Sequence, residues 1–202
     1  MKENNSKQVL LSVLGVAILV VAVVGVSFAA FSYSKTGEKV NTITTGTITM
    51  SYSETTNGIN LTNALPMTDG VGKALADTNQ YFDFTVSANI TGTTTINYAI
   101  TATKEVDSTL PEDGVKLYLT NMDDDADTQI TAPTKFNAIP KTTAGEESSA
   151  PADQAELYNG TFNSTDSHDY RLRMWVADDY SVTGTSQTFK VRVNVYGAAA
   201  AQ

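Results

Sequence analysis

The chain has 202 residues, with 22 acidic and 13 basic side chains, one histidine and no cysteine. The net charge of −9 disfavours nucleic acids and anionic membrane surfaces as partners, because both are densely negative. A sequence without cysteine has no disulfide framework and no thiolate metal site. The composition therefore describes an acidic chain of ordinary domain size that must be stabilised by packing.

The first element in chain order is an uncharged apolar run at residues 9–31, preceded by Lys2 and Lys7. A helix of this length spans about 34 Å, which is enough to cross a bilayer. A cleaved signal peptide and a retained transmembrane anchor both fit this pattern.

A short motif at the end of the run favours cleavage. Ser27 and Ala29 provide the two small side chains that a signal peptidase recognises, so we expect a cut between Ala29 and Ala30. Residues 1–29 are then a signal peptide, and the mature protein is secreted to the extracellular matrix or the cell surface.

Most of the remaining chain alternates apolar and polar residues with a period of two, which is typical of half-buried strands. The predicted strands lie at residues 46–52, 59–61, 81–90, 96–102, 115–119, 170–176 and 189–195. About eight short strands and no long amphipathic helix after the signal predict an all-β, jelly-roll-type β-sandwich. We also expect the strands at 81–90 and 96–102 to form a hairpin.

The predicted connections are polar. Residues 131–153 are rich in Pro, Thr, Ser, Ala and Glu, with only Phe136 and Ile139 to bury, which predicts a mostly exposed loop. Pro66 with Asp69 and Gly70 predicts a turn. The sandwich domain is expected at residues 40–197, followed by a flexible tail at 198–202.

Several segments together carry a family resemblance. They are A-A-F at 29–31, S-K at 34–35, N-T-I-T-T-G-T-I at 41–48, I-N-L-T-N-A-L-P at 59–66 and Y-F-D-F-T-V at 81–86. In this order and spacing they resemble the TasA and camelysin family of secreted biofilm fibre proteins. The resemblance implies a jelly roll and cleavage between Ala29 and Ala30 by a SipW-type signal peptidase.

The resemblance also implies self-assembly, in which the N-terminal strand of one subunit completes the sandwich of the next. Phe31 and Tyr33 would lie on the buried face of this donor strand, and they alternate with small residues over 30–34. The K-T-G-E-K sequence at 35–39 suits a flexible hinge, so residues 30–39 are expected to form the donor strand and its hinge.

Two groups of residues are candidates for metal chemistry. His168 is the only histidine, and a zinc site needs three or four ligands, so we expect it in a turn or loop rather than in a catalytic site. The acidic run Asp123, Asp124, Asp125 and Asp127 is a candidate calcium site, although it lacks the Gly and distal Glu of an EF-hand loop. The alternative is a solvated loop. No cofactor and no catalytic residue are expected.

Four basic residues, Arg171, Arg173, Lys190 and Arg192, are predicted to face away from the apolar core together with Trp175. They either keep the surface soluble or form subunit contacts with acidic loops of a neighbour. Trp175 is either an exposed anchor for such a contact or is covered by the long loop.

These observations favour a structural protein: a secreted fibre subunit that assembles with copies of itself. A membrane-anchored monomeric domain for surface binding or adhesion is the second interpretation. A secreted camelysin-like metallopeptidase is the enzymatic alternative, but the sequence contains no H-E-x-x-H motif.

Overall fold

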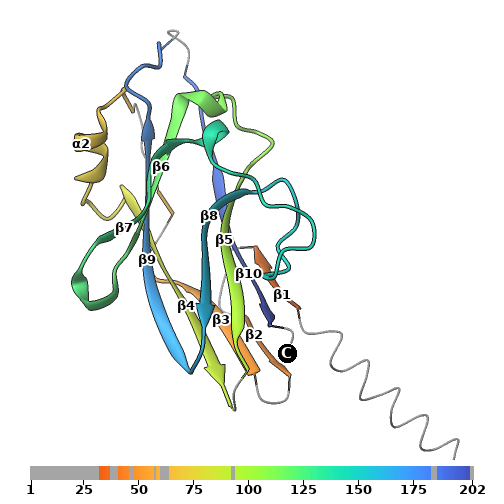
Figure 1. Ribbon diagram of the computed structural model, residues 1–202. Helices are drawn as coiled ribbons and strands as arrows, with labels where there is room; N and C mark the ends of the chain where they lie inside the picture. Colours follow the sequence, from red (N-terminus) through yellow and green to blue (C-terminus); the bar gives the residue numbers. More distant parts are fainter. Residues whose placement is uncertain are drawn as a thin grey trace, which may run out of the picture. The chain divides into compact units, whose positions relative to one another are not determined.

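The computed structural model describes residues 32–36, 41–45, 48–56, 58–59, 64–91, 94–182 and 186–200, and their side chains from residue 49 onward. In these ranges the chain forms ten strands in two antiparallel sheets (Figure 1). The strands are β1 (Ser32–Thr36), β2 (Asn41–Thr45), β3 (Ile48–Glu54), β4 (Tyr81–Ile90), β5 (Ile96–Lys104), β6 (Val115–Asn121), β7 (Thr128–Lys135), β8 (Ala155–Phe162), β9 (Asp166–Val176) and β10 (Val191–Ala199).

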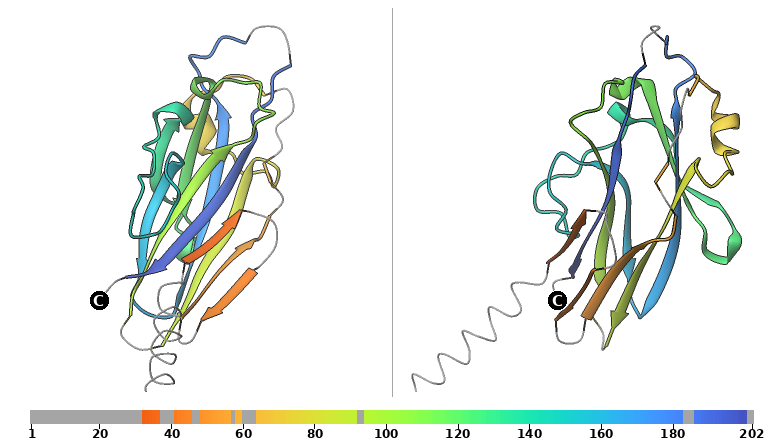
Figure 2. Two further views of the ribbon diagram at one scale, coloured as in Figure 1. Left: turned by 90° about the vertical axis from the view of Figure 1, so that its right-hand side faces the viewer. Right: turned by 180° about the vertical axis from the view of Figure 1, so that it is seen from behind.

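The two sheets pack face to face as layers (Figures 1 and 2). One sheet has the strand order β1-β10-β5-β8 and the other has β2-β3-β4-β9-β6-β7. The prediction of an all-β fold with two packed sheets is therefore confirmed. A short helix, α2 (Asp69–Lys73), lies in the stretch where a turn was expected.

The core lies between the sheets and is rich in aromatic side chains. The alternation predicted for β4 is confirmed, because Phe82, Phe84 and Val86 are buried and the residues between them are partly exposed. The Phe84 ring packs on Tyr52 and Tyr170, with ring centroids 5.6 and 5.5 Å apart. Burying such rings removes large apolar areas from water and holds the layers together.

The predicted hairpin between β4 and β5 is wrong. β4 pairs with β3 and β9 in the six-stranded sheet, whereas β5 pairs with β10 and β8 in the four-stranded sheet. Both strands bury one face in the same core, so period-two alternation identifies the buried face but not the neighbouring strand.

Two other predictions are corrected in part, and one strand was not predicted. The proposed loop at 131–153 begins inside β7, and β8 follows it as a strand that the sequence reading missed. In the rest of this loop most residues are exposed, and Phe136 and Ile139, the two residues expected to be buried, are each only 2% exposed. The first two residues of the predicted tail, Ala198 and Ala199, belong to β10 and pair with β5, whereas residues 201–202 lie outside the described residues.

The predicted signal peptide or membrane helix lies outside the described residues, as does most of the strand expected at 59–61. Within the described ranges, no helix is both long and apolar enough to cross a membrane.

Candidate assembly edge

β1 forms one edge of the four-stranded sheet and pairs antiparallel with β10 (Figure 2). The ladder runs from Ser32 opposite Ala198 to Thr36 opposite Asn194. Among the described residues, β10 is the only strand that pairs with β1. We call residues 194–198, which receive β1, the acceptor edge.

The core face of the acceptor edge requires a glycine. Gly197 lies opposite Tyr33 in the register, and a Cβ atom built on Gly197 would overlap Sδ of Met50 in the facing sheet. Glycine inside a strand often marks such a close approach. Next to it, Val195 is fully buried. The two layers therefore touch directly beneath the edge that receives β1.

The outer face of the acceptor edge is also covered. Tyr196 is 4% exposed, and its hydroxyl accepts a hydrogen bond from Nε2 of Gln154 at 2.9 Å. Asn194 is fully buried and donates from Nδ2 to Oε1 of the same glutamine at 3.4 Å. Both faces of β10 are therefore packed against residues other than those of β1.

A groove of about 380 Å³ lies between the sheets beside the first residues of β10. Apolar side chains from both layers line it, namely Ile59, Phe82, Leu172, Met174, Phe189, Val191 and Val193. Charged side chains also line it, namely Glu54, Glu105, Lys190 and Arg192. The β1 ladder ends opposite Asn194, so the edge at 191–193 has no strand neighbour on this side within the described ranges.

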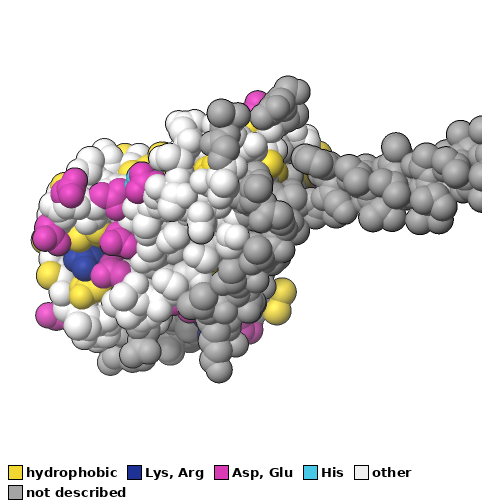
Figure 3. Space-filling view, turned by 90° about the horizontal axis from the view of Figure 1, so that it is seen from below, with side chains coloured by type: hydrophobic (Ala, Val, Ile, Leu, Met, Phe, Trp, Pro, Cys, Tyr) yellow, Lys and Arg dark blue, Asp and Glu magenta, His cyan; other side chains and the backbone are white. Residues whose placement is uncertain are grey.

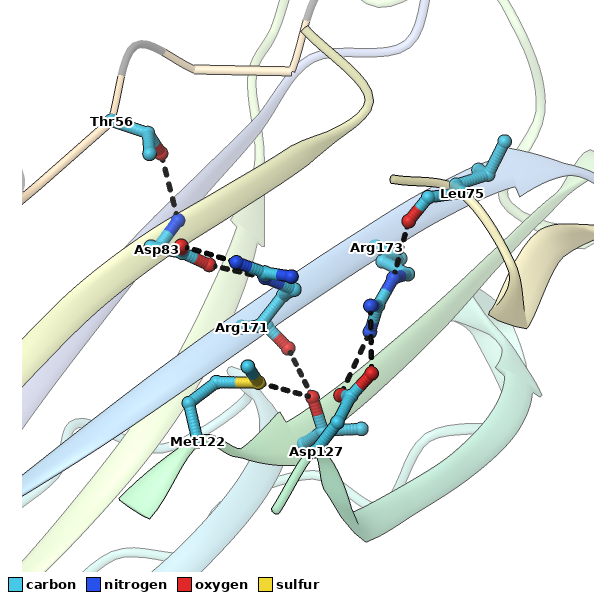
Figure 4. A network of polar contacts seen from close by, with 8 residues as sticks. Thr56, Leu75, Asp83, Met122, Asp127, Arg171 and Arg173 are labelled. Atoms are coloured by element: carbon cyan, nitrogen blue, oxygen red, sulfur yellow. Dashed lines mark hydrogen bonds and ion pairs between the residues drawn. The ribbon is translucent and has the colours of Figure 1, made fainter. Parts of the chain in front are cut away.

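Arg171 and Arg173 lie on β9 and turn toward different carboxylates (Figure 4). Arg171 donates from Nε and Nη2 to the two carboxylate oxygens of Asp83, both at 2.7 Å. This bidentate pair raises the pKa of Arg171. The guanidinium also lies 3.7 Å from the ring centroid of Tyr81.

Trp175 and Arg173 are buried, so the prediction of an exposed subunit anchor is wrong. Trp175 is only 1% exposed and Arg173 only 3% exposed. Arg173 donates from Nε to the Leu75 carbonyl at 2.8 Å, and its Nη atoms donate to the two carboxylate oxygens of Asp127 at 3.1 and 2.9 Å.

The cover over Trp175 comes from the α2 region and not from the long loop. The indole packs with Leu75, Tyr118 and Met67, which we call the Trp175 cluster, and contacts the backbone at Gly72. Strand alternation correctly puts Trp175 on the outer face of its sheet, but it cannot reveal that a short helix returns over that face.

Lys190 and Arg192 also have acidic partners in their own subunit. Lys190 pairs with Asp107, and Nε of Arg192 donates to Glu105 at 2.7 Å. Arg171 and Arg173 belong to a strand of the other sheet. Each of the four basic residues therefore has an acidic partner in its own subunit.

The first residue of the acidic run 123–127 is hydrogen-bonded to other groups of the protein. Asp123 accepts hydrogen bonds from the Asp169 amide at 2.7 Å and Asn121 Nδ2 at 2.8 Å, and it contacts Nδ1 of His168 at 2.6 Å. Burial alone would raise the pKa of Asp123, but these contacts outweigh it and lower the pKa.

Asp124 and Asp125 in the same run have positive φ angles of 57° and 58°. Acidic side chains gather at one side of the face shown in Figure 3. However, no group of three or more His, Cys, Asp or Glu side chains in the described ranges has a geometry that could hold a metal ion. The candidate calcium site at Asp123, Asp124, Asp125 and Asp127 is therefore not assembled in this structure.

His168 lies within β9 and not in a turn or loop, which corrects the prediction. Its ring stacks on Phe162 with centroids 5.1 Å apart and an interplanar angle of 16°. Its contact with Asp123 joins β9 to the end of β6, so the described geometry gives it a structural role.

Of the residues expected at the processing site and in the donor strand, Ala29, Ala30 and Phe31 lie outside the described residues. Tyr33 lies in β1. The strand also includes Lys35, which was assigned to the hinge.

Sequence reasoning missed Gly197 in the acceptor edge and Glu54 in the lining of the groove. The glycine inside the apolar V-Y-G-A stretch was an available signal of close approach, whereas nothing in the sequence indicated that Glu54 would line a groove. No family model matches the chain, and none of the curated proteins compared with it matches either.

Proposed function

We propose that the protein is a secreted structural subunit of an extracellular fibre, which assembles with copies of itself by exchanging β1. The observation that carries the proposal is the place of β1, which pairs with a single strand at the edge of its sheet. A strand in this position can leave its sheet without breaking the hydrogen bonds between any other pair of strands.

The strand order supports a jelly roll as the finer description of the sandwich. When β2 and β3 are set aside, the other strands pair from the ends of the chain inward: β1 with β10, β4 with β9, β5 with β8, and β6 with β7. A chain folded up in this way has its first and last strands side by side. The N-terminal strand then closes the sandwich, and its removal exposes an edge of the sheet.

An exchanged strand would restore the same bonds. The β1 segment of a second copy has the same sequence, so it would pair with the acceptor edge in the same register and satisfy the same backbone groups. An acceptor edge left empty would expose unpaired N–H and C=O groups, which favours occupation by one copy or the other. Repetition of this exchange in one direction builds a filament.

The test is removal of the donor segment. A mature chain that lacks residues 30–34 should fold and be secreted as a monomer, and it should bind a synthetic peptide of residues 30–39. A variant with Phe31→Ser and Tyr33→Ser keeps the backbone and should bind its neighbour more weakly. Fibres of normal morphology from the deleted protein, seen by electron microscopy, would contradict the proposal.

A second candidate is a monomeric surface domain that remains attached through its N-terminal apolar run. It is favoured by the same ladder, because β1 completes the sheet of its own molecule. Replacing Ala29 with a bulky residue distinguishes the two. The fibre proposal expects uncut, membrane-bound precursor and loss of fibres, whereas the anchored monomer expects the natural protein to be uncut and membrane-bound already.

A further inference from the structure

The four-stranded sheet has a second edge at β8, at the end of the strand order opposite to β1. The first half of β8 is covered within the molecule. Lys141 forms a bridge with Ala155, and the amide of Glu156 donates to the Pro140 carbonyl at 2.8 Å. The second half, residues 158–162, has β5 as its only strand neighbour within the described ranges. We call these five residues the β8 edge, and the side of it that faces away from β5 is open to another strand.

The β8 edge lacks the features that protect an exposed sheet edge. Proteins commonly guard such edges with charged side chains or with proline. The edge strand β7 of the other sheet contains both, at Pro133 and Lys135. The β8 edge has the sequence Y-N-G-T-F, which contains neither. An extended segment can therefore pair with it without meeting a like charge or a missing N–H.

A polar pocket of about 250 Å³ adjoins the β8 edge on the outer face of the sheet. Asn159 and Thr161, which are both exposed, line it from β8. Glu146 and Glu147 line it from the loop that precedes β8. The loop is tied to β5 beside the pocket, because Nδ2 of Asn97 donates to Glu147 at 2.8 Å. The pocket is therefore built from an open strand edge and an acidic loop held next to it.

The pocket carries negative charge without a cation. Oε1 of Glu146 accepts hydrogen bonds from the amide and the hydroxyl of Thr143, whereas its Oε2 is buried without a hydrogen-bond partner. Among the ion pairs of the described residues, none includes Glu146 or Glu147. A carboxylate oxygen that is buried without a donor is unfavourable, so a cationic side chain that enters the pocket would relieve this cost.

A strand added to the β8 edge would direct alternate side chains toward the pocket. Side chains that are directly opposite each other in a ladder lie on the same face of the sheet. Residues that pair with Asn159 and Thr161 would therefore lie on the outer face, beside the pocket that these two line. A lysine or arginine at such a position has a long apolar stem and a cationic end that suits the two glutamates.

We propose that the β8 edge and its pocket bind an extended segment of a partner protein that carries a lysine or arginine. Backbone pairing with the β8 edge supplies the affinity, and the basic side chain in the pocket supplies the specificity. β1 and β8 are at opposite ends of the same sheet, so this site is separate from the acceptor edge. The inference goes beyond the proposed self-assembly and does not depend on strand exchange.

A synthetic peptide tests the site. The probe is the fluorescein-labelled heptapeptide V-T-V-K-V-T-V, in which the lysine and the threonines lie on one face of a strand and the valines on the other. It is titrated with the purified full chain, and binding is measured by fluorescence anisotropy. The matched control is V-T-V-E-V-T-V, which should bind about tenfold more weakly because its glutamate meets like charges. Equal affinities, or no binding of the lysine peptide, would overturn the proposal.

Variants of the protein locate the contact of the lysine. Glu146→Gln and Glu147→Gln remove a charge at nearly constant size, and each should weaken binding of the lysine peptide by roughly three- to tenfold. Glu156→Gln, on β8 but outside the lining of the pocket, removes the same charge and should leave the affinity unchanged. Equal weakening by all three variants would indicate general attraction to an acidic protein and would overturn the pocket.

N-methylated peptides test the backbone pairing. Successive N–H groups of a strand point to opposite sides, so only every second N–H of the bound peptide donates to the β8 edge. One analogue carries N-methyl groups on the two valines next to the lysine, and the other carries them on the lysine and the second threonine. Only one of the two should lose affinity, by about tenfold or more. Equal affinities of the two analogues would show that the peptide does not bind as an added strand.

Discussion

The acceptor edge and the Trp175 cluster lie in different sheets and are held by different kinds of interaction. β1 is joined to the acceptor edge by a backbone ladder to one strand. Around Trp175, the side chains of Met67 and Leu75 on either side of α2 interlock with those of β6 and β9, and the buried Arg173 ties the Leu75 carbonyl to Asp127. A ladder can be reproduced by any copy of the same segment, whereas the cluster needs residues that are far apart in one chain. Under the proposed function, the fold therefore has an exchangeable side and a fixed side.

The largest expected loss of stability comes from a mutation in the Trp175 cluster, on the fixed side. Trp175→Ala removes a side chain whose residue is 1% exposed and leaves a cavity under α2, so the free energy of unfolding should fall by about 3–5 kcal/mol. Urea denaturation measures the loss. Val182→Ala, at a residue that is 52% exposed, is the control and should change stability by less than about 0.5 kcal/mol. A loss below about 1 kcal/mol at Trp175 would mean that the cluster is not tightly packed.

The second largest loss of stability is expected when the counter-ion of Arg173 is removed. Asp127→Asn leaves a guanidinium that is buried without its carboxylate, and we expect a loss of about 2–3 kcal/mol. This is below the value for a fully buried pair, because the Asp127 side chain is 42% exposed and therefore partly screened. Asp125→Asn, in the same exposed turn, is the matched control.

The same pair has a defined pH dependence. Burial would raise the pKa of Asp127, but the hydrogen bonds from Arg173 and Thr120 and the positive charges of Arg173 and Arg171 together outweigh it, so the folded pKa is lowered. A carboxyl group of this kind stabilises the fold above its unfolded pKa of about 3.9, and the contribution is lost as the pH falls through the folded pKa. The difference in stability between the natural protein and Asp127→Asn should therefore be full at pH 7 and shrink in acid. A difference that grows in acid would contradict the pairing.

The fold was predictable where a single strand carries the information, and less so where strands must be paired. The alternation of β4 predicts its buried face because Phe82, Phe84 and Val86 all need one apolar side. It does not predict that β5 lies in the opposite sheet, because pairing depends on the whole chain. The burial of Trp175 was likewise unpredictable, since its cover comes from a helix about a hundred residues earlier in the sequence. The position of β1 at an edge agrees with the donor-strand expectation but does not test it.

A third effect probes the exchangeable side. Gly197→Ala places a methyl group against Sδ of Met50, so packing must shift and stability should fall by about 1–3 kcal/mol. Adding Met50→Ala should relieve the overlap, so the double variant should lose less than the sum of the two single losses. Additive losses in urea titrations would show that the two residues are not in contact. The predicted overlap lies under the acceptor edge, so the single variant should also bind the 30–39 peptide less tightly.

The smallest expected change in stability concerns Arg192, which can be compared with Arg173. Arg192 pairs with Glu105 as Arg173 pairs with Asp127, but the Arg192 side chain is 44% exposed and that of Arg173 is 4% exposed. Exposed pairs contribute little, because water and salt screen them and both side chains lose conformational freedom. Arg192→Gln should therefore change the free energy of unfolding by less than about 0.5 kcal/mol, at low and at high salt, in the same urea titration. A loss of stability as large as that of Asp127→Asn would place Arg192 among the fixed contacts and remove it from the exchangeable side.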